Sequence, residues 1–428
     1  MKSETKCAVV SAVDEQRSKI FSIADQVLRN PELGYQEVAT SALVRSVFDQ
    51  WDIPYTYPHA LTGVRGVLKG RTSRFRVAII GEMDALHCSA HPYAAGTVAH
   101  ACGHHAQVAA MLGAAIALKQ SGVMEQLDGD VVFLAVPAEE FIELDERKKL
   151  QAQGKISFFG GKQQLIAEGV LDDIDMAIMI HARANCPEPQ LFTRIRNLGF
   201  RAKTITFYGK AAHGGRPYEG TNALNAAALA LLGIHANRET FREEERIRIH
   251  PIMTRGGDVV NAVPDEACLE TFVRGADAAA IRKAEDVVRR AVNGAADMIG
   301  ATARIEDIPG YLPLKESPAL SAVMEDIYTE LCHRKPIRDN ESFGSSDIGD
   351  VSALIPVIQP YVGGFRGGLH SRELLVSDPD AAYLLPAKLL ALTAAALLSD
   401  GAALAQEVKT SFQPTMTKEA YLAYLRGE

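Results

Sequence analysis

The sequence predicts an α/β protein, with a mixed, mostly parallel sheet covered by helices and a ferredoxin-like α+β domain inserted into it. Three apolar runs, at 75–86, 130–140 and 174–182, each end in polar residues. Apolar runs of this kind, separated by helical segments, are typical of parallel strands that are buried on both faces. Between residues 195 and 308 the order changes to strand, helix, two strands, helix and strand, which is the ferredoxin-like order.

A chain of 428 residues exceeds the size of one compact domain, so at least two domains are expected. The larger domain is expected to comprise residues 1–194 and 309–428, on either side of the insert. Its first helices are predicted at about 11–29 and 38–50, before the three strands. Near its end, the apolar segment 381–398 contains a proline and a lysine. We therefore interpret this segment as a buried core helix and not as a membrane span.

The insert, residues 195–308, is expected to fold as a small domain of its own. Residues 201–209 alternate between apolar and polar side chains, as a strand with one exposed face does. The remaining elements follow in the order helix, strand, strand, helix and strand, at 222–236, 246–254, 267–275, 277–299 and 302–307.

Composition and charge exclude several classes of protein. Hydrophobic residues make up 47% of the chain and charged residues 23%, which indicates a globular protein with a large core. The net charge of −8 argues against non-specific binding of nucleic acids or anionic membranes. The first residues lack an apolar stretch of signal-peptide length, and six scattered cysteines do not suggest a disulfide framework. We therefore expect a cytoplasmic protein with reduced thiols.

Candidate metal ligands stand at the ends of the predicted strands and loops. They are a thiol, three imidazoles and two adjacent carboxylates: Cys102, His104, His181, His370, Glu139 and Glu140. Ligands of parallel sheets gather at the carboxyl ends of the strands, and these groups suit zinc, manganese or cobalt. Each residue alone has an ordinary interpretation, such as a core histidine, a solvated turn or a small buried thiol. Together they favour a metal site.

The adjacent carboxylates of Glu139 and Glu140 suit metal-assisted hydrolysis. One carboxylate binds the ion, and the other takes a proton from the water that the ion holds. Adjacent side chains point in opposite directions along a regular strand. Both can reach one ion only if the pair lies at an irregular strand end.

Eight motifs occur in the order and spacing of one metallopeptidase family: GEMDAL, HACGHH, PAEE, IMIHA, GKAAHGGRP, GGDVVNAVPDEA, GSSDIGDVS and GGLHS. Over nearly its whole length the chain resembles the aminoacylase and glutamate-carboxypeptidase family. Within that family it looks most like the amidohydrolase branch of hippurate, indole-acetyl-amino-acid and p-aminobenzoyl-glutamate hydrolases. The resemblance implies a metallopeptidase catalytic domain with an inserted lid or dimerisation domain, and it does not specify the substrate.

The resemblance also implies a role for each matching residue of the larger domain. One or two divalent ions per subunit, of zinc, manganese or cobalt, would be bound by Cys102, His104, Glu140, His181 and His370. Glu139 matches the general base. Asp84 matches an acid that orients the ligands from behind them.

Three residues of the insert match further family positions. His213 matches a histidine that reaches the active site of a neighbouring subunit, and Asn261 and Arg274 match residues that hold polar groups of the substrate. Without the resemblance, His213 is interpreted as an exposed turn residue and Arg274 as a surface charge. Because the family pairs its subunits through this domain, which exposes a sheet edge, we expect a homodimer or a multiple of it.

The chain departs from the family pattern near the ligands. Glu82, His87 and His105 stand where the family has aspartate, proline and aspartate, and the lost acid at His105 leaves the number of ions open. The segment 141–160 replaces a short glycine-rich stretch. Its phenylalanines either line a pocket for an aromatic group or pack locally: Phe141, Phe158 and Phe159.

These features imply a metal-dependent hydrolase of a C–N bond in a small substrate that bears a carboxylate, with the amide bond of an N-acyl or N-aroyl amino acid preferred. His213 and the metal would stabilise the tetrahedral oxyanion. One alternative is an aminohydrolase that replaces the amino group of an electron-poor aromatic amine, of the 5-nitroanthranilate type, with hydroxyl and releases ammonia. Another is a non-catalytic binding protein, which the complete ligand set disfavours.

Overall fold

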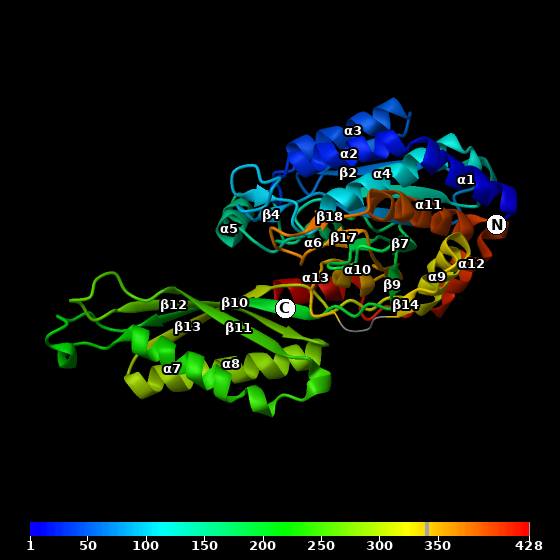
Figure 1. The fold of residues 1–428 in the computed structure, drawn as a ribbon. Coiled ribbons are helices and arrows are strands. Elements are labelled where there is room, and N and C mark those ends of the chain that lie inside the picture. Colours follow the sequence, from blue (N-terminus) through cyan, green and yellow to red (C-terminus); the bar gives the residue numbers. More distant parts are fainter. Residues whose placement is uncertain (339–341, 428) are drawn as a thin grey trace. The chain divides into compact units, whose positions relative to one another are not determined.

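The computed structural model, which describes residues 1–338 and 342–427, divides the chain into two compact units (Figure 1). Unit 1 comprises Met1–Ile195, Lys315–Glu341 and Asp350–Leu422, and unit 2 comprises Arg196–Leu314, Ser342–Gly349 and Ala423–Glu428. Three short segments assigned from sequence to the larger domain, which begin at Pro309, Ser342 and Ala423, therefore lie with unit 2. Gly344 accepts a backbone hydrogen bond from Leu198 at 2.8 Å, and Arg201 lies over the ring of Tyr424. Segments this short carry no periodic pattern that shows which core they join.

The main sheet of unit 1 has the strand order β1-β2-β6-β3-β7-β15. Strands β6, β3, β7 and β15 are parallel, whereas β1 and β2 are antiparallel to their neighbours. Every residue of β6 is buried, as expected for a strand covered on both faces. The predicted mixed, mostly parallel sheet is confirmed. The strands are β1 Tyr55–His59, β2 Gly63–Leu68, β3 Arg76–Glu82, β6 Asp130–Val136, β7 Met176–Ile178 and β15 Val357–Ile358.

Unit 1 also contains several short strands outside this main sheet. They form a four-stranded sheet in the order β14-β9-β16-β8 and two ribbons, β4-β5 and β17-β18. Their bounds are β4 Leu86–His87, β5 Val98–Ala99, β8 His181–Ala182, β9 Leu191–Thr193, β14 Ile337–Arg338, β16 Tyr361–Val362, β17 Phe365–Arg366 and β18 Leu375–Val376.

Helix α4 is the central helix of unit 1 and packs against α2, α11 and β3. It is apolar all round, and its residues from His104 to Leu118 are buried. A Cβ at Gly113 would lie 2.9 Å from Ile20 Cδ1 and 3.0 Å from Ala387 Cβ, so small residues let its neighbours approach closely. Apart from α7 and α8, which belong to unit 2, the helices are α1 Ser3–Glu15, α2 Arg17–Arg29, α3 Val38–Gln50, α4 His104–Gln120, α5 Leu144–Ala152, α6 Gly161–Ala167, α9 Pro318–Cys332, α10 Ile348–Ser352, α11 Leu385–Leu398, α12 Ala403–Ser411 and α13 Lys418–Arg426.

The prediction of one helix over 11–29 is wrong. The segment contains two helices, α1 and α2, with a break at Gln16, whose φ and ψ are −93° and 11°. The break falls in a polar stretch without glycine or proline, so the sequence gives no stop signal there. The helix Asp380–Leu398 is long and apolar enough to cross a membrane, but 89% of its apolar window is buried in the structure. It begins with a π-helical turn, Asp380–Leu384.

Unit 2 is a four-stranded antiparallel sheet in the order β11-β12-β10-β13, with α7 and α8 packed together on one face (Figure 1). This is the predicted ferredoxin-like arrangement. Helix α8 has clear start and stop signals: the Asp277 side chain accepts a hydrogen bond from Ala280 N at 2.8 Å, and Gly300 ends the helix with φ of 73°. The elements are β10 Gly199–Tyr208, α7 Ala223–Ala236, β11 Arg248–Arg255, β12 Glu266–Gly275, α8 Ala278–Ile299 and β13 Thr302–Pro309.

Candidate metal centre

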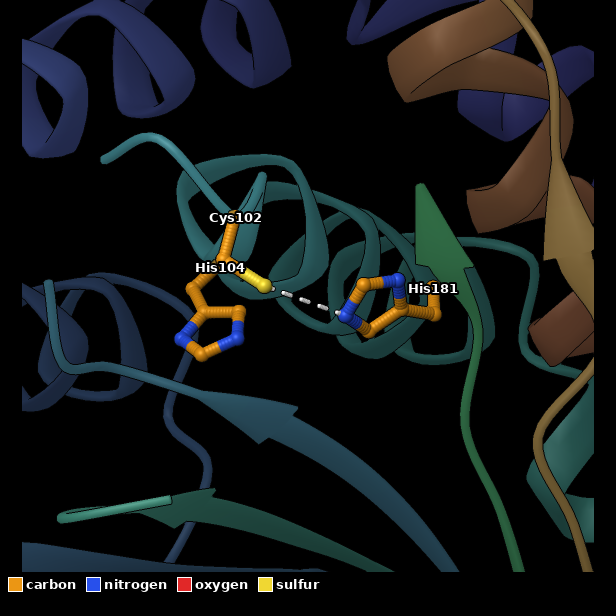
Figure 2. A group of neighbouring side chains, drawn as sticks. All are labelled: Cys102, His104 and His181. Carbon is orange, nitrogen blue, oxygen red and sulfur yellow. Dashed lines mark hydrogen bonds between the residues drawn. The ribbon is translucent and has the colours of Figure 1, made fainter. Parts of the chain in front are cut away.

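The structure brings together the predicted ligands of unit 1 from four separate segments. Cys102 and His104 stand at the start of α4, and His181 begins β8; Figure 2 shows these three side chains grouped around one space. The remaining members follow β6 and β17: Glu139, Glu140 and His370. All except His370 are buried, with exposed fractions between 0% for His104 and 9% for His181.

Irregular backbone at three positions aims these side chains. Gly103, Ala138 and His370 have positive φ values of 86°, 55° and 58°. Gly103 also requires the absence of a side chain, because a Cβ there would lie 2.7 Å from the Cβ of Ala182. Residues other than glycine rarely adopt this conformation, and they concentrate at functional sites. Because Ala138 turns the chain after β6 ends at Val136, the adjacent glutamates do lie at an irregular strand end, as predicted.

The distances around the Cys102 sulfur match those between ligands of one ion. Cys102 Sγ lies 3.5 Å from His181 Nε2 and 3.3 Å from His370 Nε2. The latter nitrogen lies 3.3 Å from Glu140 Oε1. Tetrahedral ligands with bonds of about 2.1 Å are separated by about 3.4 Å. The sulfur therefore stands between two candidate ligand groups, Cys102–His104–His181 and Cys102–Glu140–His370.

The orientation of His104 is fixed by Asp84. His104 Nδ1 lies 2.8 Å from the Asp84 backbone oxygen, so this nitrogen carries the proton and Nε2 presents its lone pair to the site. Asp84 Oδ2 also accepts a hydrogen bond from the backbone N–H of Glu140 at 2.8 Å. The fully buried Asp84 thus holds two candidate ligands at once.

Within the described residues, several buried atoms of the site make no hydrogen bond: His104 Nε2, Glu140 Oε1 and Asp84 Oδ1. Buried polar atoms are nearly always partnered, so each such atom requires an explanation. A divalent cation would satisfy the first two directly. Thiolate, imidazole and carboxylate are the donors that zinc and related first-row ions take. The residues therefore fit such a cation.

The electrostatics of the group point the same way. Burial raises the pKa of Cys102, but the neighbouring His104 and His181 outweigh this effect and hold the pKa well below its usual range. The hydrogen bond to Cys102 and the adjacent carboxylate of Glu140 raise the pKa of His370 to about 11. The imidazoles attract protons because thiolate and carboxylate give the site a surplus of negative charge. A bound cation balances the same charge.

One residue that holds the glutamate pair was not identified from the sequence. Arg147 of α5 is 2% exposed, and its guanidinium donates hydrogen bonds to the backbone oxygens of Glu140 and of Phe159, the latter at 2.7 Å. It occurs in the charged run DERKK, which resembles a solvated helix face and gives no sign of burial. Around it, the rings of Phe141 and Phe159 lie 6.0 Å apart, which is the local packing considered for segment 141–160.

The three departures from the family pattern have different environments. His87 is exposed, and its Nε2 lies 2.7 Å from Glu143. His105 is buried, its ring lies 5.8 Å from the ring of His100, and burial lowers its pKa to about 3. Glu82 is fully buried beside His104, with its Oε2 3.3 Å from Nε2.

In unit 2, the structure brings His213 and Asn261 together and places Arg274 elsewhere. His213 is exposed, its Nδ1 accepts a hydrogen bond from Gly215 N at 3.0 Å, and Gly214 N donates to Asn261 O at 2.7 Å. Arg274 lies at the opposite end of β12, where it donates to Ser345 at 2.6 Å. Their roles toward a substrate stay predictions.

A parallel sheet with a thiolate, imidazoles and paired carboxylates at its carboxyl edge has the architecture of a hydrolase that uses divalent ions. The sequence model of Peptidase family M20/M25/M40 matches residues 78–394, so the chain belongs to this family. The family consists of hydrolases of amide and peptide bonds, and the chain is an enzyme of this class. This confirms the resemblance seen in the sequence.

Individual relatives show which proteins the chain is similar to. It is 26% identical to the IAA-amino acid hydrolase ILR1-like 4 of Arabidopsis thaliana, over 80% of this chain and 77% of that protein. It is 27% identical to the Xaa-Arg dipeptidase of Homo sapiens, over 91% and 88%. The crystal structure of the Bacillus subtilis YXEP protein, described as a dinuclear metal-binding peptidase, shares the fold with a TM-score of 0.71 and 22% identity, over 90% and 99%.

Proposed function

We propose that this enzyme is a metal-dependent amide hydrolase that releases an amino acid from a small N-acyl or N-aroyl amino acid. The observation that carries the proposal is the buried pair of acceptors without hydrogen bonds, His104 Nε2 and Glu140 Oε1, which face a thiolate next to a second carboxylate, Glu139. The similarity to an IAA-amino acid hydrolase supports this substrate class.

Five side chains are proposed to hold one or two divalent ions: Cys102, His104, Glu140, His181 and His370. A bound ion would supply positive charge that polarises the substrate carbonyl and acidifies a water molecule. Asp84 keeps the protein side of the site in place, because it fixes both the ring of His104 and the backbone of Glu140.

Glu139 is proposed to move the proton. Its Oε2 lies 3.8 Å from His104 Nε2, at the edge of the ligand group, and its side chain is 7% exposed. A carboxylate in this position can accept the proton of the attacking water and return it to the leaving nitrogen, which is the task of a general base and acid.

His213 is proposed to donate to the developing oxyanion in the site of a neighbouring subunit, with Asn261 and Arg274 holding polar groups of the substrate. The proposal of a homodimer is supported by β11, an edge strand of the described unit 2 sheet. Its apolar residues Ile252 and Met253 are 51% and 37% exposed. Unpaired sheet edges with apolar side chains favour association with another chain.

The test combines metal analysis with a substrate panel. The purified protein should contain a divalent metal, lose activity with a chelator and regain it with zinc, manganese or cobalt. N-acyl and N-aroyl amino acids are assayed for released amino acid, and nitro-substituted anthranilates for released ammonia. Full activity of the metal-free protein contradicts the metal site. Release of ammonia, with every amide intact, contradicts amide hydrolysis and supports the aminohydrolase alternative instead.

A further inference from the structure

A buried ion pair lies directly behind His104. Glu82 is the last residue of β3 and is fully buried, and Lys162 of α6 is 1% exposed. The Lys162 ammonium lies 2.5 Å from Glu82 Oε1. Gln107 of α4 donates a hydrogen bond to the other oxygen, Oε2, at 2.7 Å. Three elements therefore converge on this one carboxylate.

The Oε2 atom of Glu82 also faces the metal-ligand side of His104. It lies 3.3 Å from His104 Nε2, the nitrogen that is free of hydrogen bonds. This separation equals those between His370 and its neighbours Cys102 and Glu140, and it matches the spacing of about 3.4 Å expected for two ligands of one ion. The ligand atoms of Glu82, His104 and Glu139 all lie within 4.8 Å of one another.

The length of the side chain decides what this carboxylate can reach. The aspartate that the family pattern has at this position is one methylene shorter than Glu82. Glutamate spans the distance between the Lys162 ammonium on one side and His104 Nε2 on the other, with one oxygen for each. Glu82 Oε2 also keeps acceptor capacity beyond its bond to Gln107, because a carboxylate oxygen has two lone pairs.

We propose that Glu82 is a further metal-ligating residue and binds the same ion as His104. We also propose that Lys162 limits how strongly Glu82 binds this ion. This inference rests on the proposed metal-dependent function. The Lys162 ammonium binds Oε1 of Glu82, so Oε2 would be the oxygen that faces the ion. The ammonium also offsets one of the negative charges that the thiolate and the glutamates bring to the site. The two partners of the ion pair therefore act on metal affinity in opposite directions.

A purely structural ion pair makes a different prediction. In that case loss of either partner leaves a buried charge, lowers stability and has no specific effect on the metal. A second buried pair in the chain serves as the matched control: Lys203 Nζ lies 2.9 Å from Glu285 Oε1, and the two side chains are 2% and 10% exposed. This pair belongs to unit 2, whereas the candidate ligands belong to unit 1.

The experiment measures the affinity for Zn²⁺ and Co²⁺ by competition with a chelator, and the visible spectrum of the Co²⁺ protein, in the full-length chain. Glu82→Gln should weaken the affinity by about 10- to 100-fold and change the Co²⁺ bands. Lys162→Met should raise the affinity and shift these bands, because the carboxylate loses the ammonium that competes for its negative charge. Lys203→Met should change neither. Circular dichroism and a melting curve report folding.

If Glu82→Gln does not fold, Glu82→Asp takes its place. It keeps the negative charge and tests whether the length of the side chain matters for metal binding. It should lose affinity, because the shorter side chain cannot span from Lys162 to the ion. Unchanged affinity within twofold and unchanged Co²⁺ bands in either Glu82 variant overturn the inference, while the metal site of the proposed function stands. A wild-type chain that binds neither metal overturns both. Equal weakening by Lys162→Met and Glu82→Gln also overturns it, because the pair then acts only through stability.

Discussion

Unit 1 and unit 2 hold their predicted site residues in opposite environments. In unit 1, His104, Glu139 and Glu140 are 0%, 7% and 8% exposed, and each belongs to a group of candidate ligands whose atoms lie within 4.8 Å of one another. In unit 2, His213 and Asn261 are exposed. Electrostatic interactions are far stronger where water is excluded. The comparison teaches that unit 1 has a preorganised charged site, whereas a donor such as His213 acquires strength only where another surface covers it.

The largest expected effect comes from replacing the proposed proton acceptor of unit 1. Glu139→Gln should lower kcat by about 10² to 10⁴, the usual contribution of a general base, because the amide cannot accept a proton. Metal content and melting temperature should stay at the wild-type values, since the substitution keeps the shape of the side chain. Steady-state kinetics and metal analysis check this. A variant within threefold of wild type places the base elsewhere.

The next effect concerns the sulfur that joins the two ligand groups. Cys102→Ala should weaken zinc binding by more than about 100-fold, because loss of an outer partner of a ligand alone costs about 10- to 100-fold. Cys88 is half-buried and not among the candidate ligands, so Cys88→Ala is the control. Competition with a chelator measures both. Equal affinity of Cys102→Ala and Cys88→Ala would point to a different set of ligands.

A third experiment asks whether unit 2 of one chain serves unit 1 of another. His213→Ala and Glu139→Gln chains, each nearly inactive, are mixed in equal amounts under conditions of subunit exchange. Half of the dimers are then mixed and hold one intact composite site, so about a quarter of wild-type activity should return. No recovery, with exchange demonstrated by differently tagged chains, means that His213 does not act across subunits.

The smallest effect is a pH dependence of stability in unit 1. Burial raises the pKa of Glu316 from 4.5 to about 7, although its oxygens accept hydrogen bonds from Gln359 N at 2.8 Å and Ile195 N at 3.2 Å. Between pH 4.5 and about pH 7, Glu316 holds a proton in the folded chain and has released it in the unfolded chain. The contribution of Glu316 to stability is therefore complete below about pH 4.5 and lost as the pH rises through 7.

Glu316→Gln should remove this part of the pH dependence. Melting temperatures of the variant and the wild type, measured at pH 5 and pH 8, give the comparison. The wild type should lose more stability between the two values than the variant does. A pH dependence that is the same in both proteins assigns it to other groups.

Much of the fold could be predicted from local patterns. The apolar runs gave β3, β6 and β7, and the caps Asp277 and Gly300 set the bounds of α8. The candidate ligand set could be proposed from the sequence because thiol, imidazole and carboxylate groups stood at successive strand ends. Lys162 was not visible, because its burial depends on Glu82, which lies 80 positions away in sequence. Burial that depends on a distant partner leaves no periodic signal.

The order in which the candidate ligands are synthesised follows from their spacing in the sequence. Cys102 and His370 are 268 positions apart, and the residues of unit 2 from Arg196 to Leu314 are made between them. At about 5 to 20 residues per second, His370 leaves the ribosome roughly 15 to 50 s after Cys102. During this interval the Cys102 thiol is present but His370 is not, so the candidate site is incomplete. The candidate centre is therefore completed late in biosynthesis, and metal supplied early would meet only part of the proposed ligand set.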